Sequence, residues 1–345
     1  MYKEMGECPL MSRIMLGRRQ SLLGLTAGLG ALSMPFIQTA RAAGTPVKLV
    51  TSWYAQAEFG GFYQALAKGY YAREGLDVTI EAASPQMNVP QLLAAGRADF
   101  ITGYDFQLLS AVASGIPLVA VASTFQHDQQ GLMTHAGVTD LQQLKDHPIL
   151  IASSSHATFW PWLRKRFGYT EEQARPYSFN LQPFFFDKSM AVQAYASSEL
   201  WDAKLKGMPV EFFLFKDLGY PPYGAPMITT QQMVKTDKNK VNSFVKASLL
   251  GWNDYFQDPT PGNALILKAN PNMTPEHLTF GYEGLKKANV LLSDDVRTKG
   301  LGAMTTARWQ ATRDFMVNQN LLPADADWKS ACTTEFVDNL RIMPT

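Results

Sequence analysis

The chain has very little cysteine, since Cys8 and Cys332 are the only two among its 345 residues. Cys8 lies in a segment that we expect to be removed, so the mature protein would keep one cysteine and form no intramolecular disulfide. A single cysteine also excludes a zinc or iron–sulfur site built from cysteines. The five histidines are scattered without metal-ligand spacing. We therefore predict neither a metal ion nor a cofactor.

The sequence also lacks a nucleophile elbow of the form G-x-S-x-G, and its glycine-containing stretches lack the Lys-Ser/Thr pair of a phosphate loop. These absences argue against a hydrolase and a nucleotide-dependent enzyme. The chain also lacks a large excess of positive or negative residues. The chain has 31 basic and 30 acidic residues, and residues 1–42 contain five of the basic and two of the acidic ones. The remaining chain therefore has 26 basic and 28 acidic residues, a net charge of −2. We expect no binding to nucleic acid.

Residues 1–42 have the pattern of an export signal. Arg18 and Arg19 precede the apolar stretch "SLLGLTAGLGALSMPFI", and "ARA" at residues 40–42 offers a small-x-small cleavage site. The arginine pair predicts the twin-arginine route, although Ser21 stands where that signal favours an aromatic residue. The alternatives are a general export signal and a retained membrane anchor. No later apolar run approaches the roughly 20 residues that a membrane span needs. We expect a soluble periplasmic protein and a monomer.

Beyond residue 44, strand-like and helix-like segments alternate. Short apolar runs such as "PVKLVTSW", "LDVTIEAA" and "IPLVAVASTF" predict strands. The segments between them carry apolar residues at helical spacing, as at Phe59, Phe62, Tyr63, Leu66 and Tyr70. Strands that alternate with helices of this length predict parallel βαβ units with right-handed crossovers. The predicted fold class is α/β.

About 300 mature residues suit two α/β lobes. The sequence changes character near His135, and the stretch "GYPPYGAPM" has the proline and glycine content of a connection. We expect one lobe from residues 45–134 together with 225–345, a second lobe from residues 135–217, and a hinge at 218–224. A cleft between two such lobes is a natural site for a small ligand.

A family resemblance extends over nearly the whole mature chain. The stretch "WYAQAEFGGFYQALAKGYYAREGLDVTI" and the later segments "LLAAGRADF", "GIPLVAVAS", "TDLQQLKDHPILIAS" and "YASSELW" carry it in order. The chain resembles substrate-binding proteins of ABC importers, in the branch related to the thiamine-pyrimidine synthases of fungi. The resemblance implies a type II periplasmic binding fold and a pyrimidine-like ligand. Relatives also bind sulfonates, nitrate or riboflavin. The enzymatic branch carries a run of cysteines, which the lone Cys332 does not match.

Candidate ligand contacts stand at strand–helix junctions, where carboxyl ends of strands face the crevice of open α/β sheets. Trp53 ends the first strand and can stack on a flat ring, while Glu58 can accept hydrogen bonds from ring amino groups. Phe62 is a candidate pocket wall from the following helix. Tyr104 and Asp105 follow the third strand. The alternative for each is packing in the core or, for Glu58 and Asp105, capping of a helix.

The second lobe supplies a matching set. Ser154 and Ser155 open a helix and could hold an acceptor or anionic group, and Trp160 could form a wall. Asn180 offers both a donor and an acceptor. The resemblance implies that Glu199 anchors the ring, although Leu200 follows it where relatives often have proline. Tyr195 is a further candidate from the same stretch, "YASSELW". Helix capping and core packing are again the alternatives.

The sequence therefore predicts a receptor that closes over a small heteroaromatic ligand, such as a thiamine-pyrimidine precursor, and delivers it to a permease in the inner membrane. We predict no enzymatic activity. The alternatives from other classes are a pyrimidine synthase, self-consuming or dependent on pyridoxal phosphate, and a ligand-binding sensor for a signalling partner. The alternative ligands are a sulfonate, nitrate or a flavin.

Overall fold

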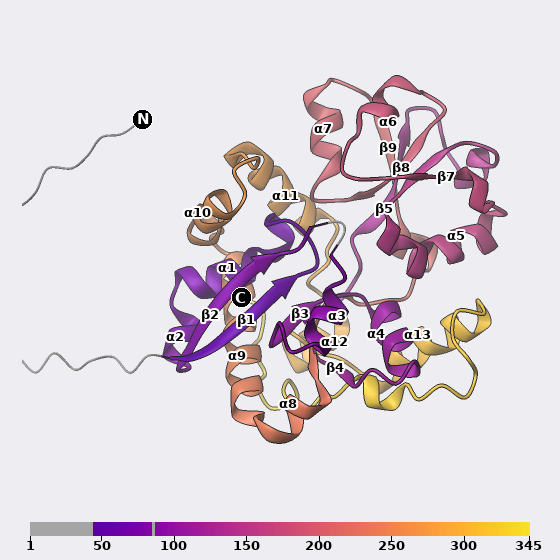
Figure 1. Ribbon diagram of the computed structural model, residues 1–345. Helices are drawn as coiled ribbons and strands as arrows, with labels where there is room; N and C mark the ends of the chain where they lie inside the picture. Colours follow the sequence, from indigo (N-terminus) through magenta and orange to yellow (C-terminus); the bar gives the residue numbers. More distant parts are fainter. Residues whose placement is uncertain (1–43, 85–86) are drawn as a thin grey trace, which may run out of the picture. The chain divides into compact units, whose positions relative to one another are not determined.

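The computed structural model describes residues 44–84 and 87–345. The predicted export signal lies outside these residues, and so does its cleavage site. The described chain contains two five-stranded sheets with helices around each (Figure 1), which confirms the predicted α/β class. Within the part of the chain that is described, no helix is both long enough and apolar enough to cross a membrane.

The first sheet has the strand order β2-β1-β3-β10-β4. Strand β1 lies between β2 and β3 and pairs in parallel with both, as the alternation of strands and helices predicts. Strand β10 is antiparallel to both of its neighbours. The elements of this part are β1 (Thr45–Thr51), η1 (Ala57–Phe59), α1 (Gly60–Ala67), α2 (Tyr70–Arg73), β2 (Leu76–Ala82), α3 (Val89–Ala94), β3 (Phe100–Thr102), α4 (Asp105–Ala113), β4 (Leu118–Phe125) and β10 (Gly224–Thr230).

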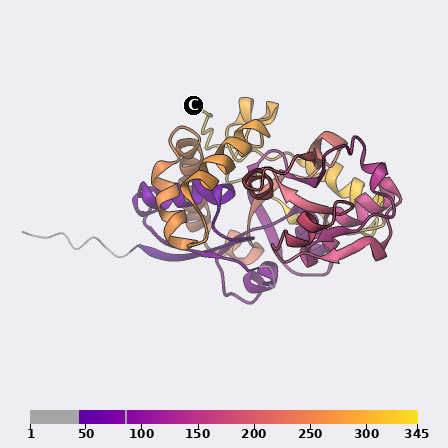
Figure 2. The ribbon, with the colours of Figure 1, turned by 90° about the horizontal axis from the view of Figure 1, so that it is seen from above.

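The second sheet has the order β7-β6-β8-β5-β9, and its strands lie together in both views (Figures 1 and 2). Strand β6 is parallel to β7 and β8, whereas β5 is antiparallel to β8 and β9. Its elements are β5 (Gln130–His135), η2 (Leu141–Leu144), β6 (Ile149–Ile151), η3 (Ser153–Ala157), α5 (Phe159–Phe167), η4 (Glu171–Gln173), β7 (Ala174–Pro176), α6 (Gln182–Phe186), β8 (Ala191–Tyr195), α7 (Glu199–Leu205) and β9 (Val210–Leu214).

The chain crosses between the sheets twice, at residues 126–129 and at residues 215–223, which include η5 (Phe215–Leu218). The first crossing precedes the lobe boundary predicted at residue 134, because residues 130–135 already pair with β8 and β9. Arg308 joins the two crossings, since its guanidinium donates hydrogen bonds to the carbonyls of Gln126, Pro221 and Pro222. The paths between the lobes are thus held side by side.

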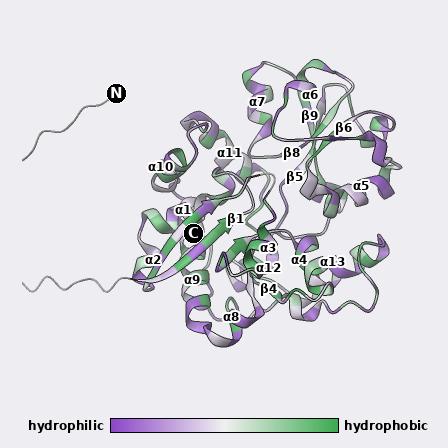
Figure 3. Ribbon diagram, viewed as in Figure 1, coloured by the Kyte–Doolittle hydropathy of each residue, from purple (hydrophilic) through white to green (hydrophobic). Residues whose placement is uncertain are grey.

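The remaining helices follow β10, and α9 packs closely on α1. An added Cβ at Gly61 would lie 2.2 Å from the Trp252 ring, so this contact requires glycine. Hydrophobic residues gather in the strands, as the green ribbons of Figure 3 show, and β4 is buried along its whole length. These helices are α8 (Gln231–Thr236), α9 (Lys238–Tyr255), α10 (Thr260–Ala269), α11 (Pro275–Lys287), α12 (Asp294–Lys299), α13 (Thr306–Asn318) and η6 (Lys329–Ala331).

Candidate ligand-binding site

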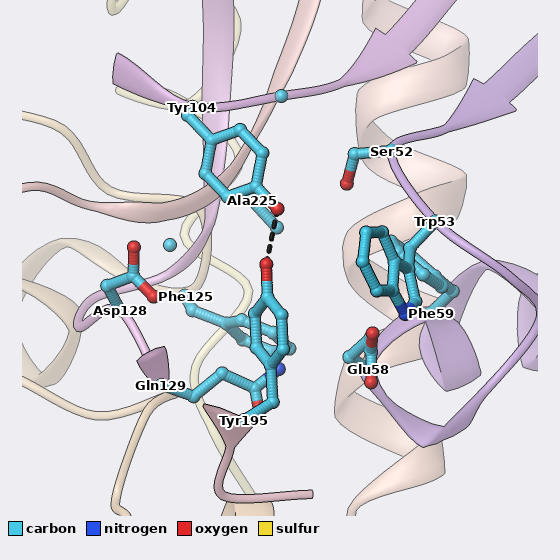
Figure 4. A pocket seen from close by; sticks show the side chains of 12 residues that line it. Ser52, Trp53, Glu58, Phe59, Tyr104, Phe125, Asp128, Gln129, Tyr195 and Ala225 are labelled. Atoms are coloured by element: carbon cyan, nitrogen blue, oxygen red, sulfur yellow. Dashed lines mark hydrogen bonds between the residues drawn. The ribbon is translucent and has the colours of Figure 1, made fainter. Parts of the chain in front are cut away.

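A cavity lies where the ends of β1, β3, β4 and β8 meet the first crossing segment and the start of β10 (Figure 4). Counted together with the solvent open to it, this space measures about 360 Å³. Both sheets contribute to its lining, and most of the lining side chains are aromatic or acidic. The aromatic members are Trp53, Phe59, Tyr104, Phe125 and Tyr195, and the polar members are Ser52, Glu58, Asp128 and Gln129.

The end of β1 is fixed by one hydrogen bond to its neighbour β3 and by one within the turn that follows β1. The Ser52 amide donates to Thr102 Oγ1 at 2.8 Å, and Thr51 Oγ1 donates to the carbonyl of Trp53 at 2.8 Å. These bonds turn the chain out of the sheet immediately after the strand. Trp53 consequently faces the cavity, and only 5% of its surface is exposed.

Tyr104 and Tyr195 face each other across the cavity from different sheets. Their hydroxyl groups are hydrogen-bonded to each other, as the dashed line in Figure 4 shows. Tyr195 is held from behind by Glu199, whose Oε2 accepts from the Tyr195 amide at 2.8 Å and whose Oε1 accepts from the Tyr177 hydroxyl at 3.0 Å. Glu199 therefore positions one wall of the cavity and is not itself part of the lining.

Glu58 is a buried carboxylate at the bottom of the cavity in the view of Figure 4. Ser197 Oγ, which belongs to the segment after β8, donates to Glu58 Oε2 at 3.0 Å. Burial and then the nearby Glu199 carboxyl raise the pKa of Glu58 to about 8. No lysine, arginine or histidine among the described residues forms an ion pair with it. A buried carboxylate with a raised pKa in a cavity is characteristic of functional sites.

Asp128 and Gln129 are lining residues that the sequence analysis did not identify. They lie in the first crossing segment, directly after β4. Asp128 accepts two hydrogen bonds from Gln130, one from its amide at 2.8 Å and one from its side chain at 2.7 Å. Burial raises the pKa of Asp128 to about 6. The available signal was the polar run "QHDQQ" at the carboxyl end of the buried strand β4.

An open groove adjoins the cavity and shares Ser52, Trp53 and Tyr104 with it. Its empty volume is about 1240 Å³, and it runs between helices α3 and α4 and the turn η3 of the second sheet. Ser154, a predicted contact, lines this groove and not the inner cavity. A ligand longer than one ring has room to extend from the cavity into this groove.

Four predicted contacts, Trp53, Glu58, Tyr104 and Tyr195, line the cavity together. Asp105 is buried behind it, where its Oδ2 accepts from the Tyr223 amide at 2.8 Å, because it is used to hold the second crossing segment.

The structure places the other predicted contacts away from the cavity lining. Phe62 packs against Trp252 in the core because it lies on the face of α1 that meets α9. Trp160 is buried and donates to Glu171. Asn180 is exposed, and its Oδ1 accepts from the Gln182 amide at the start of α6. Ser155 is buried, and its carbonyl accepts from Thr158 within a turn.

The cavity lining contains unpaired hydrogen-bond donor and acceptor atoms and, among the described residues, no cationic side chain. Trp53 Nε1 and Gln129 Oε1 are buried and have no hydrogen-bond partner within residues 44–84 and 87–345. Buried polar atoms are normally paired, so these two atoms are available to a bound molecule. Neither the cavity nor the groove is lined by lysine, arginine or histidine in the described part of the chain. The arrangement suits a flat molecule with hydrogen-bond donors.

No group of three or more His, Cys, Asp and Glu side chains that could hold a metal ion occurs among the residues described.

The family model described as NMT1/THI5 like matches residues 56–261 of the chain. A riboflavin-binding protein, RibY of Chloroflexus aurantiacus, is 24% identical over 305 residues, which cover 84% of this chain and 86% of RibY. A formylaminopyrimidine-binding protein of Halalkalibacterium halodurans is 34% identical over 77 residues, 22% of this chain and 23% of that protein.

Among solved structures, the chain is similar to the periplasmic aliphatic sulphonate binding protein SsuA of Escherichia coli. The TM-score is 0.60 at 16% identity, and the match covers 83% of this chain and 91% of SsuA. This likeness shows the fold, and it confirms the predicted type II periplasmic binding fold.

Proposed function

The chain belongs to the NMT1/THI5-like family, and from that premise we propose that it is the exported solute-binding receptor of an ABC importer. The receptor captures a small nitrogen-containing aromatic ligand, such as a thiamine-pyrimidine precursor, between its two lobes. It then delivers the ligand to a permease in the inner membrane. The proposal includes binding without turnover and release of the mature protein into the periplasm.

The observation that carries this proposal is the composition of the cavity. Five aromatic rings surround it, and two buried carboxylates and one unpaired amide oxygen face the enclosed space. Offset or edge-to-face contact of a ligand ring with such walls adds roughly 1 kcal/mol per ring beyond simple burial. Carboxylates accept hydrogen bonds from amino groups and from protonated ring nitrogens. The two kinds of group together favour an aminated heterocycle.

The lining also supports a choice among the ligands of related proteins. Sulfonate and nitrate are anions, and a buried anion requires cations or several hydrogen-bond donors. The lining of this cavity has two carboxylates and, among the described residues, no cationic side chain. Anionic ligands are thus disfavoured here, although SsuA shares the fold.

A flavin is the second candidate ligand. The riboflavin-binding protein RibY matches this chain over 86% of its own length. The open groove beside Trp53 and Tyr104 provides space for the parts of a flavin that the inner cavity would not accommodate. A flavin is a flat, nitrogen-rich ring system, so the same aromatic walls would contact it.

Two-lobed receptors of this fold close around their ligands by hinge motion. We propose that each lobe is built on one of the two sheets, with the first boundary at the crossing segment 126–129 and not at residue 134, and that the hinge includes residues 218–224. The contacts of Tyr104 with Tyr195 and of Ser197 with Glu58 join the two sheets across the cavity. They are the bonds that must open to admit a ligand.

A thermal-shift measurement on the mature protein tests the proposal. The panel contains aminated pyrimidines, riboflavin, alkanesulfonates and nitrate. A true ligand at 100 times its dissociation constant adds about 2.7 kcal/mol to the free energy of unfolding. We expect stabilisation by a nitrogen heterocycle and none by the anions. If no nitrogen heterocycle stabilises the protein, the proposed ligand class is wrong.

A further inference from the structure

The two carboxylates of the cavity lie on different elements and on opposite sides of Tyr195. Figure 4 shows Glu58 on the side of Trp53 and Asp128 on the side of Gln129. Glu58 is 4% exposed and Asp128 is also 4% exposed. A ligand that enters between them when the contact of Tyr104 with Tyr195 opens would meet an acidic group at each of two edges.

Neither carboxyl group has a cationic side chain beside it among the described residues, and burial favours the protonated form of each in the ligand-free protein. The groups that influence Glu58 are burial, the Glu199 carboxyl and hydrogen bonds, and those that influence Asp128 are burial and the hydrogen bonds from Gln129 and Gln130. No cation appears in either set. Burying one carboxylate without a counter-ion is costly, and burying two in one cavity is more costly still.

The walls of the cavity add a second feature that favours positive charge. The faces of tryptophan, tyrosine and phenylalanine rings carry negative electrostatic potential and attract cations that lie within about 6 Å of the ring centre. Trp53, Tyr104 and Tyr195 line the cavity on three sides, and Phe59 and Phe125 complete it. Rings and carboxylates arranged around one space are the chemistry with which proteins bind organic ammonium ions.

We propose that the ligand of this cavity is an organic cation, a flat nitrogen heterocycle whose positive charge is shared between Glu58 and Asp128. This inference rests on the proposed receptor function and narrows its ligand class. Asp128 acquires a role in specificity that neither its sequence context nor the family match assigns to it. A neutral pyrimidine or a neutral flavin would occupy the same walls but leave both carboxylates without a counter-charge.

Isothermal titration calorimetry with two matched probes tests the inference. One probe is a pyrimidine with an aminomethyl substituent, which is an ammonium ion at neutral pH. The other is the same ring with a hydroxymethyl substituent, which is neutral and nearly the same size. We expect the cation to bind roughly 10- to 100-fold more tightly, because hydrogen bonds between charged groups are worth more than neutral ones.

Variants then show whether the two carboxylates cause the preference. Asp128→Asn and Glu58→Gln keep the size of each side chain and remove its charge. Each should reduce the preference for the cation by about tenfold, while the affinity of the neutral probe changes little. Glu211→Gln, which alters an exposed carboxylate on β9, is the matched control and should leave both affinities unchanged.

The outcomes separate this inference from the proposed function. Equal affinities of the two probes for the unaltered protein overturn the inference and leave the receptor function standing, and so does tight binding of neutral riboflavin alone. A preference that survives in both variants overturns the assignment to Glu58 and Asp128. Failure of every heterocycle to bind contradicts the proposed function itself. The comparison of the two probes uses only the unaltered protein, so it tests the preference for a cation even if a variant folds poorly.

Discussion

Replacing Glu58 by glutamine should make the ligand-free protein more stable at alkaline pH while weakening the binding of an aminated ligand. The carboxyl of Glu58 has a pKa near 8 in the folded protein and an ordinary value of 4.5 when exposed. At a pH between 4.5 and about 8, the Glu58 carboxyl is protonated in the folded state and ionised in the unfolded state. Stability therefore falls as the pH rises, by about 1.4 kcal/mol for each pH unit.

The amide of glutamine does not titrate, so this loss disappears in the variant. Between pH 5.5 and pH 8, the free energy of unfolding of the unaltered protein should fall by roughly 3 kcal/mol relative to Glu58→Gln. Ser197 can still donate its hydrogen bond to the glutamine oxygen. The contributions of Glu199 and Asp128, whose pKa values are also raised, remain in both proteins and largely cancel in the difference.

Urea denaturation at several pH values between 5.5 and 8 measures this difference directly. Glu211→Gln serves as the control, because its exposed side chain should give a pH curve parallel to that of the unaltered protein. If the curves of Glu58→Gln and the unaltered protein are also parallel, Glu58 does not retain its proton in the folded state. The argument that its burial prepares it for a ligand would then be refuted.

Three further changes address the walls, the contact between lobes and the core. Trp53→Ala removes a ring from the cavity and should raise the dissociation constant at least about tenfold in calorimetry, as for central aromatic contacts elsewhere; an unchanged affinity would contradict the assignment of this wall. Tyr104→Phe removes the hydroxyl that bonds to Tyr195. The closed form should lose about 1 kcal/mol of stability, which shifts the equilibrium between closed and open lobes about fivefold toward the open form. Small-angle X-ray scattering of the ligand-free protein should show a larger radius of gyration, and an unchanged one would argue against this bond as a closing contact. Gly61→Ala places a methyl group 2.2 Å from the Trp252 ring and should lower the free energy of unfolding by about 2 kcal/mol, which a neutral effect in urea denaturation would contradict.

The sequence alone identified those parts of the site that follow from strand geometry. Trp53 and Tyr104 follow β1 and β3, which are neighbours in the first sheet, and Tyr195 ends β8 in the second sheet; the carboxyl ends of strands in α/β sheets face the ligand crevice. The structure does bring these three residues to one cavity. Glu58 was found because it lies in the turn immediately after the first of these strands.

Other parts of the site depend on packing that no local pattern reveals. The helical spacing of Phe62 fits a residue that lines the pocket as well as one in the core. Only the packing of α1 against α9 shows that its ring contacts Trp252. Asn180 has the chemistry of a ligand contact, yet its local hydrogen bond to Gln182 fixes it at the surface. Asp128 lies in a short crossing segment, and its position beside the cavity depends on how the two sheets are connected.

Native mass spectrometry of the protein, purified from its own cells without added ligand, tests the proposed ligand class. The account predicts a noncovalent one-to-one complex whose ligand, once released, has the mass and fragmentation of a nitrogen heterocycle. The same ligand should be absent from the Trp53→Ala protein prepared in parallel. A released sulfonate or other anion, or a ligand attached covalently to the chain, would contradict the account.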